Sequence, residues 1–190
     1  NYGFEKVKGK YTLILNPDTL IEKDTLQKMY DYMESNPNVG ASGCKVLNHD
    51  GTFQVACRRG FPTPWASFCK LFGLQRIFPK IKLFTQYNLN YLDENEENEV
   101  DALIGAFMFT RSEVLDKVGG FDDTFFMYGE DLDLCYRIKQ LGYRISYYPK
   151  TTIVHFKGES SKRSTLNEDK FFYEAMEIFA RKHYGNSKLF

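Results

Sequence analysis

The chain has 190 residues, of which 25 are basic and 25 acidic, so it carries no net charge with its histidines neutral. This length suits a single domain with a real hydrophobic core, and the balanced charge excludes a global field that would recruit nucleic acid. No apolar run approaches the roughly 20 residues of a membrane span, and no signal segment opens the chain. We therefore expect a cytoplasmic protein with free, buried thiols at Cys44, Cys57, Cys69 and Cys135.

The first part of the chain predicts a strand, a helix and a hairpin. The apolar run 11–15 is typical of a strand buried on both faces of a parallel or mixed sheet. Apolar residues recur at helical spacing over 24–36, and Pro37 stops the predicted helix. Residues 39–47 and 52–57 predict two hairpin strands, because an Asp-Gly pair between them suits a tight turn.

The second part predicts alternating apolar and helical segments. A long apolar stretch over 99–110 is interrupted at Gly105, as at a bulge or a close backbone approach. Glycines follow two predicted helices and indicate where each one ends. The expected helices cover 111–118, 130–141 and about 165–184, and the expected strands cover 143–148 and 151–156.

The most informative stretch is an aromatic run, 125–128, followed by Glu130, Asp131 and Asp133 at the start of a predicted helix. Acidic residues are favoured in a first helical turn, and Asp133 can pair with Arg137 four residues later. That explanation does not account for Glu130 and Asp131 beside so many aromatic rings, because desolvation and repulsion raise the free energy of such carboxylates. The stretch therefore predicts a functional site.

Two other polar segments follow predicted strands. Asn16-Pro17-Asp18 follows the strand 11–15, at the kind of edge where open α/β sheets bind ligands, although these residues are also an ordinary turn. His155 ends a β-branched run, where a lone histidine is more often structural than a ligand. A basic loop that could touch phosphate comes next, at Ser160, Ser161, Lys162 and Arg163. His49 and His183 are expected to have no acidic company at a site, and no role is assigned to them.

Together these segments resemble family 2 of the bacterial glycosyltransferases, especially the rhamnosyltransferase-like branch that builds surface polysaccharides. The resemblance implies a GT-A α/β fold, a mixed sheet flanked by helices, over a single domain 1–190. It corresponds to the metal- and acceptor-side part of the family's catalytic domain and lacks the nucleotide-binding strands that come first there. We therefore expect the chain to need that other part for activity.

The resemblance also implies roles for individual residues. Asp131 takes the position of the general base, and Glu130 would orient the acceptor or the base. Asp18 and His155 would hold Mn²⁺ or Mg²⁺ at the diphosphate of a nucleotide-sugar donor, with Asn16 in place of the first acid of the usual Asp-x-Asp motif. The acceptor side would include Arg59, Gly105 and Ala106.

Segment 58–91 mixes basic and aromatic residues. This composition fits a peripheral contact with an anionic membrane leaflet, where lipid-linked acceptors reside, and equally fits an insertion packed on the core. The basic residues are Arg58, Arg59, Lys70, Arg76, Lys80 and Lys82, and the aromatic residues include Trp65, Phe68 and Phe72.

The sequence thus predicts an inverting glycosyltransferase that moves a sugar from a nucleotide-diphosphate donor to a glycan or lipid-linked acceptor in cell-surface polysaccharide synthesis. It would work in the cytoplasm, at the inner face of the membrane. The alternative is a non-catalytic carbohydrate-binding or scaffold protein. A glycoside hydrolase also combines carboxylates with aromatic residues, but adjacent Glu130 and Asp131 are poorly placed to flank one bond from opposite sides.

Overall fold

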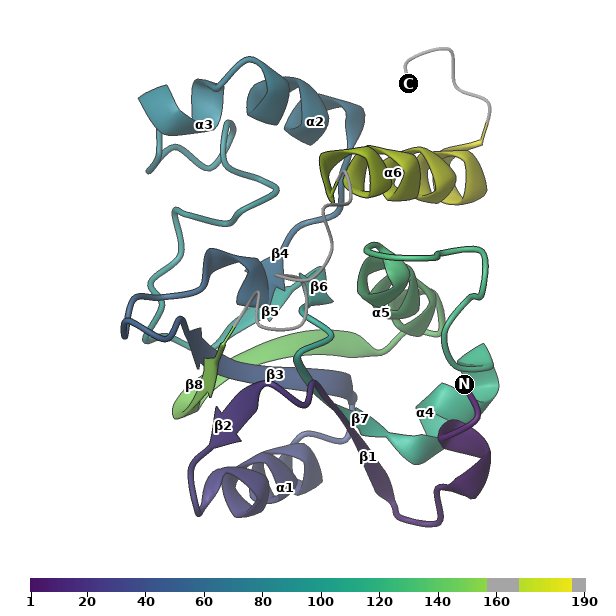
Figure 1. The fold of residues 1–190 in the computed structure, drawn as a ribbon. Helices are drawn as coiled ribbons and strands as arrows, with labels where there is room; N and C mark the ends of the chain where they lie inside the picture. The colour runs from purple at the N-terminus through teal and green to yellow at the C-terminus, as the bar shows by residue number, and fades with distance from the viewer. Residues whose placement is uncertain (157–167, 186–190) are drawn as a thin grey trace.

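The computed structural model describes residues 1–156 and 168–185. A six-stranded mixed sheet forms the centre, in the order β1-β7-β3-β8-β2, with β5 also paired to β8 (Figure 1). Two further strands, β4 and β6, form a small antiparallel pair. The strands are β1 (Tyr11–Leu15), β2 (Thr19–Ile21), β3 (Val39–Leu47), β4 (Arg58–Arg59), β5 (Asn98–Val100), β6 (Ala102–Leu103), β7 (Phe107–Arg111) and β8 (Arg144–His155).

Strand β8 is continuous where two strands were expected. It pairs in parallel with β3, and the register shifts because Cys44 lies opposite Tyr148 whereas Lys45 lies opposite Thr152. Residues 149–151 therefore bulge out of the ladder. Pro149 explains this irregularity, because proline has no N–H to donate within a sheet.

Two other expectations for strands were wrong. Strand β1 lies at the edge of the sheet, pairs only with β7 and is mostly half-buried, so it is not enclosed on both faces. After β3 the chain does turn at Gly51, whose φ is 82°, but residues 52–57 form no second hairpin strand. A single bridge joins Leu47 to Phe53, and the backbone then coils into a 3₁₀ helix over Val55–Cys57.

Helices cover the sheet in layers. Helix α1 lies below the sheet in Figure 1 and α5 above it, while α6 lies above α5 and α2 with α3 occupy the upper left. Their bounds are α1 (Thr25–Ser35), α2 (Pro64–Leu71), α3 (Leu74–Ile77), α4 (Ser112–Val118), α5 (Glu130–Gln140) and α6 (Glu168–Tyr184), with a 3₁₀ turn at Phe4–Lys6. The expected start of the last helix near 165 falls outside the described residues.

The core lies between these layers. Phe107, Tyr147 and Phe179 are among its largest fully buried side chains, which ties β7, β8 and α6 together. All four cysteines are buried and free, as predicted. Within residues 1–156 and 168–185, no helix combines the length and apolar character needed to span a membrane.

Candidate functional site

Three segments that are distant in sequence meet at one edge of the sheet. The Asn16 N–H, just after β1, donates to the Ala106 carbonyl before β7 over 3.0 Å. The Phe156 N–H, just after β8, donates to the Asp18 carbonyl over 2.8 Å. The loop 16–18, the turn 104–106 and the end of β8 are thereby fixed to one another.

His155 and Asp18 form the first half of the site. The Nε2 atom of His155 lies 3.3 Å from Oδ1 of Asp18 and 3.5 Å from the Asn16 amide nitrogen. On the other side of the ring, Nδ1 lies 2.9 Å from Oε1 of Gln54. An amide oxygen can only accept, so Nδ1 carries the proton in this contact and Nε2 presents its lone pair towards Asp18.

This pair of residues fits a divalent cation. Oδ1 of Asp18 is buried and has no hydrogen-bond donor among residues 1–156 and 168–185, a costly state for a carboxylate oxygen unless a cation occupies the space beside it. Carboxylate oxygen with imidazole nitrogen suits Mn²⁺ or Mg²⁺ when substrate oxygens complete the coordination. Among the described residues, no group of three or more His, Cys, Asp or Glu side chains could form a complete metal site alone.

Asp131 is the centre of the second half of the site. Its side chain is buried, and its Oδ2 accepts from the Arg59 guanidinium over 2.6 Å and from the Gly105 N–H over 3.0 Å. Its Oδ1 accepts from the N–H of Leu132 over 2.8 Å. These donors hold the carboxylate in one orientation at the N-terminus of α5, where the helix dipole favours negative charge.

The backbone before α5 has an unusual conformation. Tyr128 and Gly129 both have positive φ, 66° and 80°, and Gly129 is the N-cap. A Cβ on Gly129 would lie 3.0 Å from the Phe125 ring and 3.1 Å from Ala175 of α6. Positive φ at a tyrosine is uncommon and costs free energy, which the surrounding packing must offset. The strained turn aims the first turn of α5 at Gly105.

The turn at Gly105-Ala106 joins the two halves. Gly105 donates its N–H to Asp131, and the next residue, Ala106, accepts from Asn16. The carboxylate of Asp131 and the loop carrying Asp18 are therefore positioned by adjacent residues of one chain segment. Hydrogen bonds thus connect Asn16, Gly105, Ala106, Arg59 and Asp131, all of which are residues of the predicted site, and their roles in it stay predictions.

Glu130 lies beside this carboxylate in a less polar setting. Its Oε2 is buried and has no hydrogen-bond partner in the part of the chain that the structure describes. Burial, and then the neighbouring charge of Asp131, raise the pKa of Glu130 above its usual value. Two adjacent carboxyl groups thus have different environments, which is a pattern of acid and base pairs in active sites.

Arg59 and Arg58 have structural contacts that correct the expected interfacial role of these two residues. Arg58 is buried and its guanidinium donates to the carbonyls of Leu92 and Asp93. Arg59 is half-buried and paired with Asp131; desolvation lowers the pKa of its guanidinium, but Asp131 and Tyr87 raise that pKa by more. Neither cation can therefore contact a membrane surface.

Asp133 has a different role from Glu130 and Asp131. Its carboxylate is fully buried and lies 2.7 Å from each of three cationic or imidazole groups, on Arg137, Lys182 and His183. The expected pair with Arg137 is confirmed. The expectation that His183 lacks acidic company was wrong, because α6 brings it to a carboxylate 50 residues away; burial lowers the pKa of this imidazole.

One residue of the site was not predicted, and one predicted loop cannot be compared with the structure. The sequence analysis missed Gln54, whose contact with His155 spans 101 residues and leaves no local pattern. The basic loop with Ser160, Ser161, Lys162 and Arg163 lies outside the described residues.

Comparison with solved structures identifies the class of fold. The crystal structure of GalNAc-T7 with UDP, GalNAc and Mn²⁺ superposes with a TM-score of 0.53 at 15% identity, over 82% of this chain and 29% of that one. The fold is of the GT-A type, a mixed α/β sheet flanked by helices, as the sequence predicted.

The chain belongs to the family described as "Glycosyltransferase like family 2", whose model matches residues 1–169. It is 27% identical to an N-acetylglucosaminyl-diphospho-decaprenol L-rhamnosyltransferase of Mycobacterium tuberculosis, over 92% of this chain and 56% of that protein. It is 31% identical to the rhamnosyltransferase WbbL of Escherichia coli, over 77% of this chain and 52% of that protein. The chain thus spans about half the length of the curated relatives it matches.

Proposed function

We propose that this chain is the catalytic, metal- and acceptor-side part of an inverting glycosyltransferase that moves a sugar from a nucleotide-diphosphate donor to a lipid-linked glycan acceptor. The observation that supports this most strongly is the carboxylate of Asp131, held by Arg59 and the Gly105 N–H at the start of α5. Membership of the family and the similarity to two rhamnosyltransferases support the same reaction class.

In this proposal Asp131 is the general base. Inversion requires direct attack by an acceptor hydroxyl on the anomeric carbon, and the hydroxyl must lose its proton as the new bond forms. The contacts of Arg59 and Gly105 fix Oδ2, so the carboxylate is preorganised when the acceptor arrives. Glu130, adjacent and without a partner at Oε2, is placed to orient the acceptor.

Asp18 and His155 would hold the divalent cation, and Asn16 would contact the donor beside them. A cation bound there would neutralise the diphosphate as it departs. The contact between Gln54 and Nδ1 would orient the His155 ring so that Nε2 faces Asp18. Gly105 and Ala106 bring the donor loop and the base together, so both substrates would meet at this turn.

The acceptor would be met at the cytoplasmic face of a membrane. Trp65, Phe68 and Phe72 on and after α2 are 41%, 44% and 62% exposed, which suits contact with lipid. Four of the six expected basic residues remain available for an anionic leaflet once Arg58 and Arg59 are excluded: Lys70, Arg76, Lys80 and Lys82. The family gives no support for a non-catalytic scaffold.

The test is Asp131→Asn in the full-length protein. We expect kcat to fall by about 10²- to 10⁴-fold, the usual scale for loss of a general base, with donor affinity nearly unchanged. Nucleotide release with a lipid-linked acceptor measures the rate, and titration with the donor measures affinity. Asp116→Asn, at an exposed carboxylate of α4, is the matched control. Full turnover by Asp131→Asn would exclude Asp131 as the base.

A further inference from the structure

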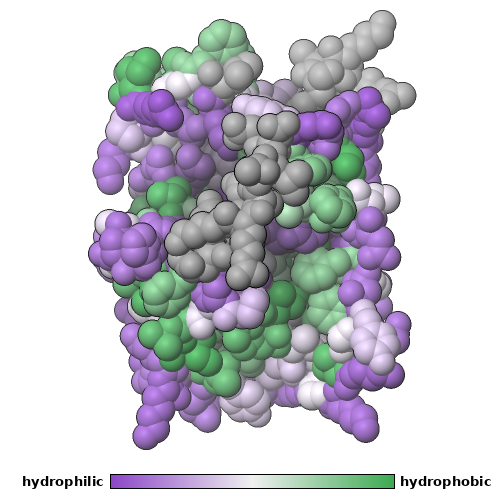
Figure 2. All heavy atoms as spheres, in the orientation of Figure 1, coloured by the Kyte–Doolittle hydropathy of each residue, from purple (hydrophilic) through white to green (hydrophobic). Residues whose placement is uncertain are grey.

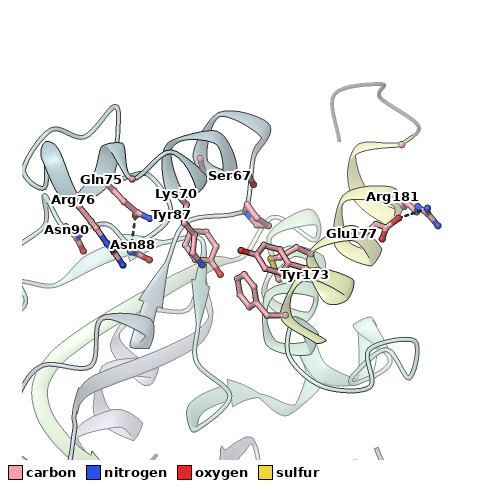
Figure 3. A pocket seen from close by; sticks show the side chains of 16 residues that line it. Ser67, Lys70, Gln75, Arg76, Tyr87, Asn88, Asn90, Tyr173, Glu177 and Arg181 are labelled. Atoms are coloured by element: carbon pink, nitrogen blue, oxygen red, sulfur yellow. Dashed lines mark hydrogen bonds and ion pairs between the residues drawn. The ribbon is translucent and has the colours of Figure 1, made fainter. Parts of the chain in front are cut away.

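A large cavity lies between α2 with α3 on one side and α6 on the other (Figure 3). It measures about 940 Å³, which is enough for a drug-sized ligand. Its lining includes three cationic side chains, Lys70, Arg76 and Arg181, but a single carboxylate, Glu177. That carboxylate already pairs with Arg181 over 2.5 Å, so the other two cations determine the charge of the cavity.

Lys70 and Arg76 have no carboxylate partner among the described residues. The ammonium of Lys70 lies 4.6 Å from the centre of the Tyr87 ring and 4.1 Å from that of Phe172. Burial, and then the charge of Arg59, lower the pKa of Lys70. An anion between Lys70 and Arg76 would offset the desolvation of the Lys70 ammonium and its repulsion by Arg59. Figure 3 shows the two side chains on the same wall of the cavity.

The cavity adjoins the proposed base. Tyr87 lines the cavity and its carbonyl accepts from the N–H of Gly60 over 2.8 Å. Arg59 precedes Gly60 and pairs with Asp131. A Cβ on Gly60 would lie 2.0 Å from the Gln86 carbonyl oxygen, so these two segments lie unusually close. A ligand in the cavity is therefore one short chain segment away from Asp131.

The outer side of α2 is apolar. Trp65, Phe68 and Phe72 form consecutive ring contacts, with centroids 5.6 and 4.5 Å apart. Trp65 and Phe68 lie on α2 together with Lys70, and Phe72 directly follows this helix. Figure 2 shows hydrophobic surface along the upper edge of the molecule, over α2 and α3, among hydrophilic patches. None of the three rings lines the cavity, so α2 has a cationic cavity on one side and an exposed apolar ridge on another, which together suit an amphiphilic anion.

We propose that this cavity binds the diphosphate of a lipid-diphosphate acceptor, with Lys70 and Arg76 as its counter-charges and the lipid chain leaving along Trp65, Phe68 and Phe72. The inference rests on the proposed function and names where that acceptor's polar head lies. A soluble nucleotide would not use the apolar ridge, which is why a lipid diphosphate is the better occupant. The amides of Gln75, Asn88 and Asn90 add hydrogen-bonding groups to the same cavity.

Binding can be measured without catalysis by using farnesyl diphosphate as the probe and the single tryptophan, Trp65, as the reporter. We expect saturable binding of farnesyl diphosphate, and weaker binding of farnesol and of inorganic pyrophosphate, which each lack one half of the amphiphile. Lys70→Met with Arg76→Met should weaken farnesyl diphosphate binding about tenfold or more, because hydrogen bonds between charged groups are lost. Farnesol binding should not change.

Lys82→Met is the matched control, since Lys82 belongs to the same segment but does not line the cavity. Lys70→Arg in place of Lys70→Met should restore most of the affinity for farnesyl diphosphate. Thermal melting checks that each variant is folded. Equal loss with Lys82→Met would show non-specific charge attraction and overturn the proposal. Equal binding of farnesol and farnesyl diphosphate would also overturn the proposal, as would unchanged affinity for farnesyl diphosphate in the double variant.

Transfer assays separate this proposal from the proposed function. With a lipid-diphosphate acceptor, the Lys70 and Arg76 double variant should raise the acceptor KM, whereas an alkyl glycoside lacking the diphosphate should be used equally by both proteins. Absence of any transfer, with the farnesyl diphosphate results as expected, would overturn the glycosyltransferase reaction and keep the cavity. Normal acceptor KM in the double variant would overturn the cavity and keep the reaction.

Discussion

Individual side chains in this site are oriented by partners that are far away in sequence. His155 has Gln54 at Nδ1 and Asp18 near Nε2, while the buried Oδ1 of Asp18 has no donor among the described residues. The imidazole thus lies between the amide oxygen of Gln54 and the carboxylate of Asp18. Loss of such an outer partner typically costs about 10- to 100-fold in metal affinity or activity.

The proposed metal site leads to a binding prediction. Asp18→Ala and His155→Ala should each weaken Mn²⁺ binding, measured directly by calorimetry in the presence of a nucleoside diphosphate, and Gln54→Ala should weaken it about 10- to 100-fold as an outer partner. Chelation should abolish transfer and added Mn²⁺ should restore it. His49→Ala, at an exposed histidine, serves as the control. Transfer that persists in chelator would exclude this site.

Glu130 leads to a prediction about pH and stability. Because its folded pKa is raised by burial and by Asp131, the folded state holds a proton there more tightly than the unfolded state does. That stabilisation is complete below the unfolded pKa, near 4.5, and is lost as pH rises through the folded pKa. Glu130→Gln should therefore increase the free energy of unfolding at pH 7.5 and leave it almost unchanged at pH 4.

Chemical denaturation at the two pH values measures this difference. Glu113→Gln, at an exposed carboxylate of α4, should show no such pH dependence. A loss of stability in Glu130→Gln at pH 7.5 would show that the ionised carboxylate has a favourable partner, contrary to the geometry.

Helices α5 and α6 are joined by charge as well as by packing. Asp133 on α5 lies 2.7 Å from both Lys182 and His183 on α6, and Lys182 also pairs with Asp122. Phe179 packs in the same interface and is fully buried. This contact fixes α6, and with it one wall of the cavity.

Removal of the Asp133 charge should destabilise the protein strongly. Asp133→Asn leaves the Arg137, Lys182 and His183 groups without their carboxylate, and breaking such a buried pair typically costs about 3–5 kcal/mol. Asp122→Asn removes a more exposed partner and should cost less than about 1 kcal/mol. Urea denaturation of both variants measures the difference; equal losses would contradict a special role for the buried carboxylate.

Local patterns predicted the elements better than their contacts. The helices at 25–35, 112–118 and 130–140 were predicted within a few residues, because apolar spacing and following glycines are local signals. The hairpin at 52–57 was wrong, since a turn signal does not say whether the next residues pair. Likewise the site loops were predicted from motifs, whereas Gln54 and His183 were missed because only tertiary folding brings them to their partners.

The whole molecule has two unlike ends. In Figure 1 the sheet and α1 form the lower part, and α2, α3 and α6 form the upper part. The exposed aromatic residues of α2 are at the upper end, next to the cavity. If the acceptor is embedded in a membrane, this end must face it, and the opening of the cavity would lie near the lipid headgroups.

Vesicle binding tests this orientation. The protein should co-sediment with vesicles of phosphatidylcholine and phosphatidylglycerol, and binding should fall as salt screens the cations. Replacing Trp65, Phe68 and Phe72 by Ser should weaken binding with little change in thermal stability. Leu20→Ser with Leu26→Ser, at exposed residues of β2 and α1, is the control. A steep loss of thermal stability in the triple variant would place these rings in the core.

The link between Asp133 and α6 also sets an order of events during synthesis. Lys182 and His183 leave the ribosome 49 and 50 residues after Asp133, several seconds later at about 5–20 residues per second. Until then, of the three Asp133 partners seen in the described residues, the nascent α5 has Arg137, on its own next turn, to balance a carboxylate that becomes fully buried. Helix α5 can thus reach its final set of charge partners only after α6 has been synthesised and has packed against it.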